Sequence, residues 1–513
     1  MTTAVAEAAA AGGAGTATGH TLDASLAGGE TVAGGGAETA AKPAGKTAAR
    51  RPVRRRRPPR RKPVRRRAAP SGPWTEAHVN RLFWRAGFGA RPDEAAFWVK
   101  QGRSATLRYV LDGGPQGSAL VGPAPSVEGR PLDPVNEWAH DGLWWLDRMV
   151  RSQRPLQEKM TLFWHDHFAT NDQDTPLMLA QNRTFRRHAL GSFPKLLRAV
   201  TLDPAMQLFL SLPDSDKEHP NENFARELME LFTLGKGYSE GDIRQAARAL
   251  TGFRARWNDN GFGGIYYDRE RHDAGVKRIF GQRGRFAWTD VLELAVAHPN
   301  HAPFLATKLW EFFVASPPSR ATVRNLAGIY RRSGHRLKPV LAAILDHPAL
   351  YRNLDAPDMV KSPIVFVAGT LRTNGLGVTY QSLTWMLDNM GQRPFDPPSV
   401  AGWEWGPAWM SSNSMRVRFD WGNRLIDDDA LGPKPGTITQ PPASPAEALE
   451  QALAAVGRPW ISGVTRSHLL EMAARFFDDL TPRTRPQRRI ERAEMLQRSL
   501  RLILLAGPDA QLH

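Results

Sequence analysis

The chain of 513 residues contains no cysteine. Disulfides, zinc–thiolate sites, iron–sulfur clusters and thiol nucleophiles are therefore excluded together, because each of them needs a cysteine sulfur. Any metal ion would have to be bound by histidine, aspartate and glutamate side chains. The lack of cysteine does not assign a compartment, since cytosolic and exported proteins can both do without it.

Long apolar runs are also missing, and no stretch of the sequence is apolar enough to cross a bilayer. The first residues do not have the pattern of a secretory signal. Arg50 and Arg51 are followed by proline and more arginine, which argues against twin-arginine export. We therefore expect a cytoplasmic protein, and these features leave export open.

The common catalytic motifs are absent from the sequence as well. There is no Walker-type phosphate loop, no dinucleotide-binding glycine pattern after a strand, no Gly-x-Ser-x-Gly elbow and no His-Glu-x-x-His pair. Nucleotide hydrolysis, hydride transfer, serine esterase and zincin chemistry are disfavoured for this reason.

Positive charge is concentrated at the start of the chain, whose net charge as a whole is +17. Residues 1–73 contain 14 Lys and Arg against 4 Asp and Glu, and 12 of these basic residues lie in 50–67, interrupted by prolines. Residues 1–49 are rich in Ala, Gly and Thr, so we predict that 1–73 form a disordered tail. Such a tail attracts polyanions such as nucleic acid or polyphosphate; the alternative is a solvated tail without a partner.

From residue 74 to 513 the sequence predicts a single large domain of the all-α class, built from many short to medium helices. Strand signals are confined to 264–268 and parts of 278–288, so at most a small hairpin is expected. Residues 431–444 are rich in Pro, Gly and Thr and predict a loop or linker. Capping residues and apolar periodicity predict helices that include 92–101, 155–168, 193–201, 239–250, 302–314, 337–345, 381–389, 445–455 and 485–505.

The segment 220–237 has the highest density of carboxylates and good helix formers. At 100° per residue, Glu222, Arg226, Glu227 and Glu230 fall on one arc, and Arg226 lies one turn from both Glu222 and Glu230. One interpretation is an amphipathic helix with a solvated, ion-paired face. The other is a polar wall of an internal cavity, in which Glu227 and Glu230 bind a metal or transfer protons.

Two further segments combine histidine with aspartate. His165 and His167 flank an aspartate among aromatic residues, and they can share a metal only if the helix ends near His165, because residues two apart on a helix point away from each other. His272 and Asp273, followed by Lys277, lie in an irregular region in which functional side chains are common. In both segments the alternative is a set of hydrogen-bonded structural residues.

A segment rich in tryptophan, proline and glycine spans residues 390–412. Its tryptophans, Trp403, Trp405 and Trp409, would either stack on a sugar or a base or pin a long loop to the body of the protein. The sequence favours the second role.

Several motifs together resemble one family. They are Arg85-Ala-Gly-Phe-Gly, Phe163-Trp-His-Asp-His-Phe, Asn221-Glu-Asn through Leu234-Gly, Ala247-Arg-Ala-Leu-Thr-Gly, His272-Asp with Lys277, Lys308-Leu-Trp, Lys361-Ser-Pro and Pro397-Pro-Ser-Val-Ala-Gly-Trp. This pattern resembles the bacterial domain-of-unknown-function 1800 family, from about residue 74 to the end. The resemblance implies no reaction, cofactor or catalytic residue. It does imply a sulfatase-like partner protein, beside which members of the family often occur.

Three hypotheses for function follow. The first is a helical hydrolase in which His165, His167, His272 and Asp273 hold a divalent metal, Glu227 and Glu230 act on protons, and Arg226 and Lys277 hold an anionic group. The second is a non-catalytic interaction or scaffold protein with an aromatic groove and a polyanion-binding tail. A haem enzyme is a more distant third, since no haem attachment motif is present. The sequence leaves open whether the protein is an enzyme.

Overall fold

The computed structural model describes residues 72–114, 120–122, 124–171, 174–259, 261–428, 430–434, 436–478 and 485–513. These residues belong to one compact unit. The tail predicted for residues 1–73 lies outside the described residues except for its last two positions.

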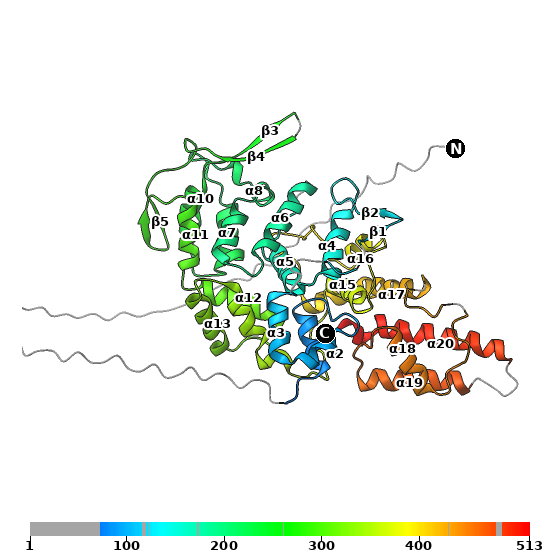
Figure 1. Cartoon of the computed structure of the whole chain (residues 1–513). Helices are drawn as coiled ribbons and strands as arrows, with labels where there is room; N and C mark the ends of the chain where they lie inside the picture. The colour runs from blue at the N-terminus through cyan, green and yellow to red at the C-terminus, as the bar shows by residue number, and fades with distance from the viewer. Residues whose placement is uncertain are drawn as a thin grey trace, which may run out of the picture. The chain divides into compact units, whose positions relative to one another are not determined.

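Helices make up nearly all of the regular structure, which confirms the predicted all-α class (Figure 1). The α-helices of the described chain are α1 (Glu76–Arg85), α2 (Glu94–Gln101), α3 (Arg103–Asp112), α4 (His140–Arg151), α5 (Pro155–His167), α6 (Thr175–His188), α7 (Phe193–Thr201), α8 (Pro204–Phe209), α9 (Asn223–Glu227), α10 (Glu240–Leu250), α11 (Trp288–Ala297), α12 (His301–Phe313), α13 (Arg320–Arg332), α14 (Leu337–Leu345), α15 (Pro363–Thr373), α16 (Leu383–Asn389), α17 (Ser412–Asp427), α18 (Pro445–Ala455), α19 (Gly463–Asp478) and α20 (Pro486–Ala506).

Three two-stranded antiparallel hairpins interrupt the helices in the described residues, where the sequence predicted at most one. They are β1 (Ser126–Val127) with β2 (Arg130–Pro131), β3 (Phe253–Asn258) with β4 (Gly261–Tyr267), and β5 (Lys277–Ile279) with β6 (Gln282–Gly284). The strand signal of β3 and β4 is weak because most of their side chains are exposed or half-buried and three positions of β4 are glycine. In Figure 1 this hairpin projects beyond the ends of α8 and α10.

The apolar side chains form two cores, and α5 lies between them. Leu156, Met160 and Trp164 of α5 belong to the first core, which α7, α10, α12 and α14 complete. Leu162, on another side of the same helix, belongs to the second core, formed largely by α4, α15, α17 and α20. A cavity bordered by α5 therefore lies where two packed bodies meet, and ligand sites are frequent at such junctions.

Local capping residues fix several helix starts in the way that the sequence predicts. Ser239 and Asp242 form a reciprocal capping box at the start of α10: the Asp242 N–H donates to Ser239 Oγ at 3.2 Å, and the Ser239 N–H donates to Asp242 Oδ2 at 2.9 Å. Asp203 caps α8 by accepting from the Met206 N–H at 3.2 Å. These contacts set the entry direction of helices that pack into the first core.

The segment 220–237 is not one regular helix. It begins as the short helix α9 and continues as a π-helix, η2 (Leu228–Thr233). Because the backbone bonds in a π-helix run to the fifth residue, the side chains leave the 100° spacing assumed from the sequence. The predicted ladder from Arg226 to Glu230 is accordingly wrong: Arg226 pairs with Glu222 at 3.1 Å and with Glu240 at 2.8 Å.

The predicted loop at residues 431–444 connects α17 to α18, and its described part contains no helix or strand. Leu431, Gly432 and Pro433 are buried, and Arg501 donates to the Leu431 carbonyl at 2.9 Å. This segment is therefore a packed loop rather than a free linker. Among the helices that the structure describes, none has the length and apolar character needed to span a membrane.

Candidate functional site

The carboxylates of the 220–237 segment face solvent rather than a cavity. Arg226 is about one-third exposed and bridges Glu222 to Glu240 at the start of α10. Glu230 is exposed and Glu227 is half-buried, with its pKa raised by partial burial and by the nearby Glu230. The arrangement is that of a solvated, ion-paired helix face, and it gives no support to catalysis by Arg226, Glu227 or Glu230.

The two histidines of α5 occupy different surroundings. The helix continues through His167, so the condition under which they could share one metal is not met. His165 is enclosed by the rings of Trp145, Phe395 and Trp403, and its Nε2 has no hydrogen-bond partner among the described residues. Burial lowers its pKa to about 3, so the ring is neutral.

His272, Asp273 and Lys277 hold their own loop together. His272 Nδ1 donates to the Thr251 carbonyl at 3.0 Å, and Arg248 Nε donates to Asp273 Oδ2 at 2.6 Å. The Lys277 ammonium donates to the main-chain carbonyls of Asp273, Gly275 and Phe286. These contacts use the Asp273 carboxylate, the Lys277 ammonium and one ring nitrogen of His272 to fold the loop, which favours the structural interpretation of this segment.

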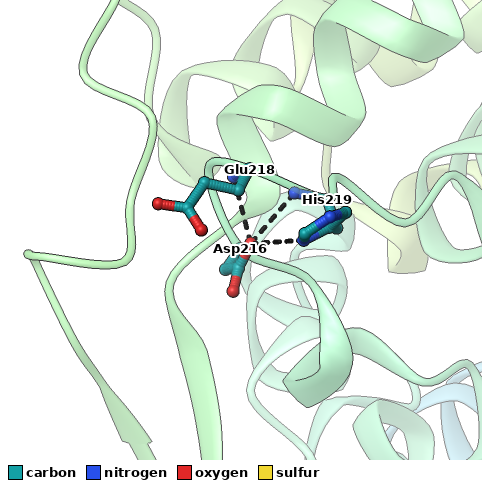
Figure 2. Close-up of side chains that lie close together, drawn as sticks. All are labelled: Asp216, Glu218 and His219. Carbon is teal, nitrogen blue, oxygen red and sulfur yellow. Dashed lines mark hydrogen bonds and ion pairs between the residues drawn. The ribbon is translucent and has the colours of Figure 1, made fainter.

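One group of three ligand-type side chains comes together within the described residues, and it is Asp216, Glu218 and His219, whose ligand atoms lie within 4.8 Å of one another. Figure 2 shows Asp216 between the other two. Asp216 Oδ1 accepts from the Glu218 N–H at 3.0 Å and from the His219 N–H at 2.9 Å, and Arg271 donates to Oδ2 at 3.2 Å. The carboxylate is thus used to fold an exposed turn, and His165, His167, His272 and Asp273 do not gather in a comparable group.

A cavity of about 500 Å³ is bordered by α5, by α12 and by segments that precede α15 and α17, and we call it the acid–base pocket. It is lined by aromatic rings, by three carboxyl groups, by one lysine and by one histidine; these residues are Phe163, Phe312, Trp405, Asp166, Glu311, Asp358, Lys308 and His167. Asp358 is compensated by Arg85, whose guanidinium lies 2.5 Å from its Oδ1. A mostly apolar pocket with a few converging titratable groups is the usual form of an active site.

Asp166 is the group whose acidity differs most from that of an ordinary carboxyl. Burial raises the pKa of Asp166 to about 6, although the Trp403 and Trp405 donors and the Lys308 charge act in the opposite direction. The Trp403 N–H donates to Oδ1 at 2.8 Å, and Trp405 Nε1 donates to Oδ2 at 2.9 Å. A carboxylate of this kind is ionised at neutral pH and is more basic than a solvated one, as a general base requires.

Lys308 is oriented by His167 and the π-helix. Because the Phe232 carbonyl can only accept, His167 Nε2 carries the proton that it donates to that oxygen at 3.1 Å, which leaves Nδ1 to accept from Lys308 Nζ at 3.4 Å. Burial and the neighbouring Lys308 hold the pKa of His167 well below its usual range. A neutral imidazole with both nitrogens in use positions the ammonium and is a poor metal ligand.

Apart from His167, the residues that line the acid–base pocket were not among the predicted site residues, and six lining residues lie at matching positions of two helices. Phe163, Asp166 and His167 follow the spacing i, i+3, i+4 on α5, and Lys308, Glu311 and Phe312 follow it on α12. This spacing puts each set on one helix face. On both helix faces a charged residue lies beside an aromatic one, and this combination in the sequence is the pattern that indicates a pocket wall.

The tryptophan loop (Trp403–Trp409) has contacts of the pinning role predicted from the sequence, and stacking on a sugar or a base stays a prediction. Trp403 and Trp409 are buried, and the hydrogen bonds from the Trp403 N–H and Trp405 Nε1 to Asp166 hold the loop against α5. Trp405, in contrast, lines the acid–base pocket. The loop is therefore attached to α5 and also forms part of the wall of the acid–base pocket.

Comparison with known proteins identifies the family. No match was found to a curated protein or to a solved structure. The family described as "Protein of unknown function (DUF1800)" matches residues 81–512, which include α5, α12, the π-helix and the tryptophan loop. The chain therefore belongs to the DUF1800 family, as its sequence motifs predicted.

Proposed function

We propose that the protein is a hydrolase whose active site is the acid–base pocket, with Asp166 as the general base. The observation that carries this proposal is the Asp166 carboxyl, whose pKa is raised to about 6 inside a cavity that also holds Lys308 and Glu311. Raised carboxyl pKa values beside a specific charge partner are typical of catalytic groups.

The reaction follows from the positions of three groups. Asp166 removes a proton from a water molecule as the water oxygen bonds to the electrophilic carbon of the substrate. The bond from this carbon to the leaving oxygen breaks, and Glu311, whose pKa is raised by partial burial, gives its proton to that oxygen. Lys308 lies close enough to Asp166 and Glu311 to act on the charge of both, and its ammonium stabilises negative charge that develops between them.

The proposal is tested with 4-nitrophenyl glycosides and carboxylic esters as a panel of hydrolysable probes. We expect Asp166→Asn to lower the rate on the accepted probe by about 10²–10⁴, the usual contribution of a general base. The rate of the wild-type protein should rise with pH through about 6, as Asp166 ionises. Glu227→Gln, at the carboxylate that the sequence suggested, should leave the rate unchanged. Equal rates for wild type and Asp166→Asn would refute the proposal.

The second candidate is a non-catalytic interaction protein. The observation that favours it is the solvated face of α9, on which Arg226 forms exposed ion pairs with Glu222 and Glu240. This candidate predicts that no probe is hydrolysed and that Asp166→Asn changes binding alone. Turnover that depends on Asp166 would eliminate it.

A further inference from the structure

A second cavity of about 500 Å³ lies on the other side of the tryptophan loop. Its lining includes two tryptophans, two carboxylates and two carboxamides, namely Trp403, Trp409, Asp388, Glu404, Asn389 and Asn413. Its volume is within the range of about 300–1,000 Å³ typical of small-molecule sites. The mechanism proposed above makes no use of this cavity.

The second cavity and the acid–base pocket are neighbours because they share this loop. Trp405 lines the acid–base pocket, whereas Trp403 and Trp409 line the second cavity. The rings of Trp405 and Trp409 meet at right angles with their centroids 6.2 Å apart. The Trp403 N–H that bonds to Asp166 connects the loop directly to the proposed base.

The lining of the second cavity matches a hydroxyl-rich ring. Carboxylate and carboxamide groups accept from or donate to sugar hydroxyls, and the largely buried indoles of Trp403 and Trp409 form the apolar part of the wall. Nucleic acid fits less well, because Asp388 and Glu404 would repel its phosphates.

Exposed tryptophans extend the aromatic surface beyond this cavity. Trp385, on α16, is 50 % exposed, and its carbonyl accepts from Asn389 Nδ2 at 2.9 Å, so it adjoins the cavity lining. Trp138 is 68 % exposed and is held near the start of α16 by Gln381, whose Nε2 donates to the Trp138 carbonyl at 3.2 Å. The Arg393 guanidinium lies over the Trp138 ring, 5.8 Å from its centroid. Two exposed tryptophans attached at one helix offer aromatic surface on which a ligand can pack.

We infer that the second cavity is a sugar-binding subsite that continues the acid–base pocket, so that the substrate is a neutral or amino-bearing glycan chain. Trp385 and Trp138 form the outer contacts of this chain. An acidic glycan is disfavoured by the same two carboxylates that disfavour nucleic acid. The inference rests on the proposed function for the chemistry at Asp166, but binding of the glycan does not require catalysis.

The binding experiment uses the full chain in native gels that contain hydroxyethyl cellulose, dextran, glycol chitin or glycol chitosan. We expect at least one of these polymers to retard the protein. Ala408→Arg, which fills the second cavity from its exposed rim, and Trp385→Ala should each weaken this retardation about tenfold. Trp257→Ala is the matched control, since Trp257 is 64 % exposed on β3, outside both cavities, and its removal should change nothing.

Three results would overturn the inference: no retardation by any of the four glycans, equal loss in the Trp257→Ala control, or retardation by single-stranded DNA alone that Ala408→Arg abolishes. Asp166→Asn separates the two proposals. If the variant still binds glycan and no longer hydrolyses it, both are supported. If it binds and hydrolyses like the wild type, the subsite stands and the proposed base is wrong.

Discussion

Asp166 and Asp273 each adjoin a histidine, and their surroundings shift their pKa values in opposite directions. Arg248 and the Gly275 N–H hold the pKa of Asp273 below its usual value, whereas burial raises that of Asp166 to about 6. Asp273 is therefore a permanent anion in an ion pair, whereas Asp166 can exchange a proton near neutral pH. At the scale of single residues, this difference separates a structural carboxylate from the one that we propose as the general base.

Asp166 should make the stability of the protein depend on pH. Its folded-state pKa of about 6 lies above its ordinary value of 3.8, so the folded state binds the proton more tightly and loses stability as pH rises from about 4 to 6. The contribution is at most about 3 kcal/mol, at 1.36 kcal/mol for each pKa unit. The free energy of unfolding of the wild type relative to Asp166→Asn, measured from pH 4 to 7, should fall by this amount. A constant difference would contradict the raised pKa.

Lys159 is a buried lysine without a hydrogen bond or ion pair to any described residue, and it lies over the rings of Phe88 and Phe312. Burial, with a contribution from Arg85, lowers its pKa to about 7, so its charge destabilises the folded state up to this pH. We expect Lys159→Met to raise the free energy of unfolding by about 1–4 kcal/mol at pH 6 and by less at pH 9.

The matched control for Lys159 is Lys361, which is equally buried and has a pKa lowered to about 7. Its ammonium donates to the Ala510 carbonyl at 2.8 Å, and Lys361→Met would leave this oxygen without that donor. The gain from Lys361→Met should therefore be smaller or negative. If Lys159→Met destabilised the protein more than Lys361→Met, the ammonium of Lys159 would have to be paired in solution.

At the scale of elements, Gly402 determines how closely the tryptophan loop approaches α5. Its φ is +83°, and a Cβ at this position would lie 2.4 Å from Asp166 Oδ1 and 2.6 Å from the Asp166 carbonyl. Neither contact is tolerable, because the carbonyl belongs to the backbone of α5 and the carboxylate is held by two donors. The loop can reach Asp166 only with glycine here.

Gly402→Ala should lower the free energy of unfolding by more than the strain of a left-handed backbone conformation alone would. Gly391→Ala is the matched control: its φ is +88°, and its Cβ would meet only the Trp409 ring at 3.8 Å. We expect the control to lower the free energy of unfolding by about 1–2 kcal/mol. Gly402→Ala should lower it by at least about 1.5 kcal/mol more, since the hydrogen bond from the Trp403 N–H to Asp166 is also lost. Loss of this donor should raise the pKa of Asp166 further, visible in its NMR titration. Equal costs for the two variants would mean that the loop does not depend on this contact.

The π-helix explains why neither the helix type of residues 220–237 nor the contacts of Glu230 and His167 could be predicted from the sequence. The sequence of 220–237 predicts one α-helix, and the switch to π geometry at Leu228 depends on packing that periodicity does not record. The result is that Glu230 leaves the Arg226 ladder, while the Phe232 carbonyl becomes available to His167. His167 was predicted as a functional residue for its metal-binding type, but its contacts give it a positioning role.

At the scale of the whole molecule, much of the architecture was accessible from local signals. Pro155, Asp203 and the Ser239–Asp242 box each mark a helix start that the structure contains. Burial is a property of the assembled fold, and it sets the pKa of Asp166. Asp166 lies on α5 and Lys308 on α12, far apart in the sequence, so no local sequence pattern could indicate that they are neighbours in the fold. The family resemblance identified the chain without identifying its site.

The basic run at residues 50–67 yields a prediction that is independent of the folded unit. If it binds polyanions, a variant lacking residues 1–71 should lose affinity for double-stranded DNA, measured by fluorescence anisotropy. The affinity of the full chain should fall by about 10³ or more between about 50 and 200 mM salt, as for proteins with many phosphate contacts. Equal affinities for the full chain and the shortened variant would favour the solvated tail.

The position of the acid–base pocket between two cores also has a thermodynamic consequence. Phe163 and Phe312 belong to or pack against the first core, whereas Val360 and Trp405 precede α15 and α17, which are helices of the second core. A bound ligand would contact both sides and would favour only the state in which both cores are folded. Ligand binding would in this way strengthen the coupling that α5 already provides between the two cores, and a partly melted protein would lose its affinity before it lost most of its helices.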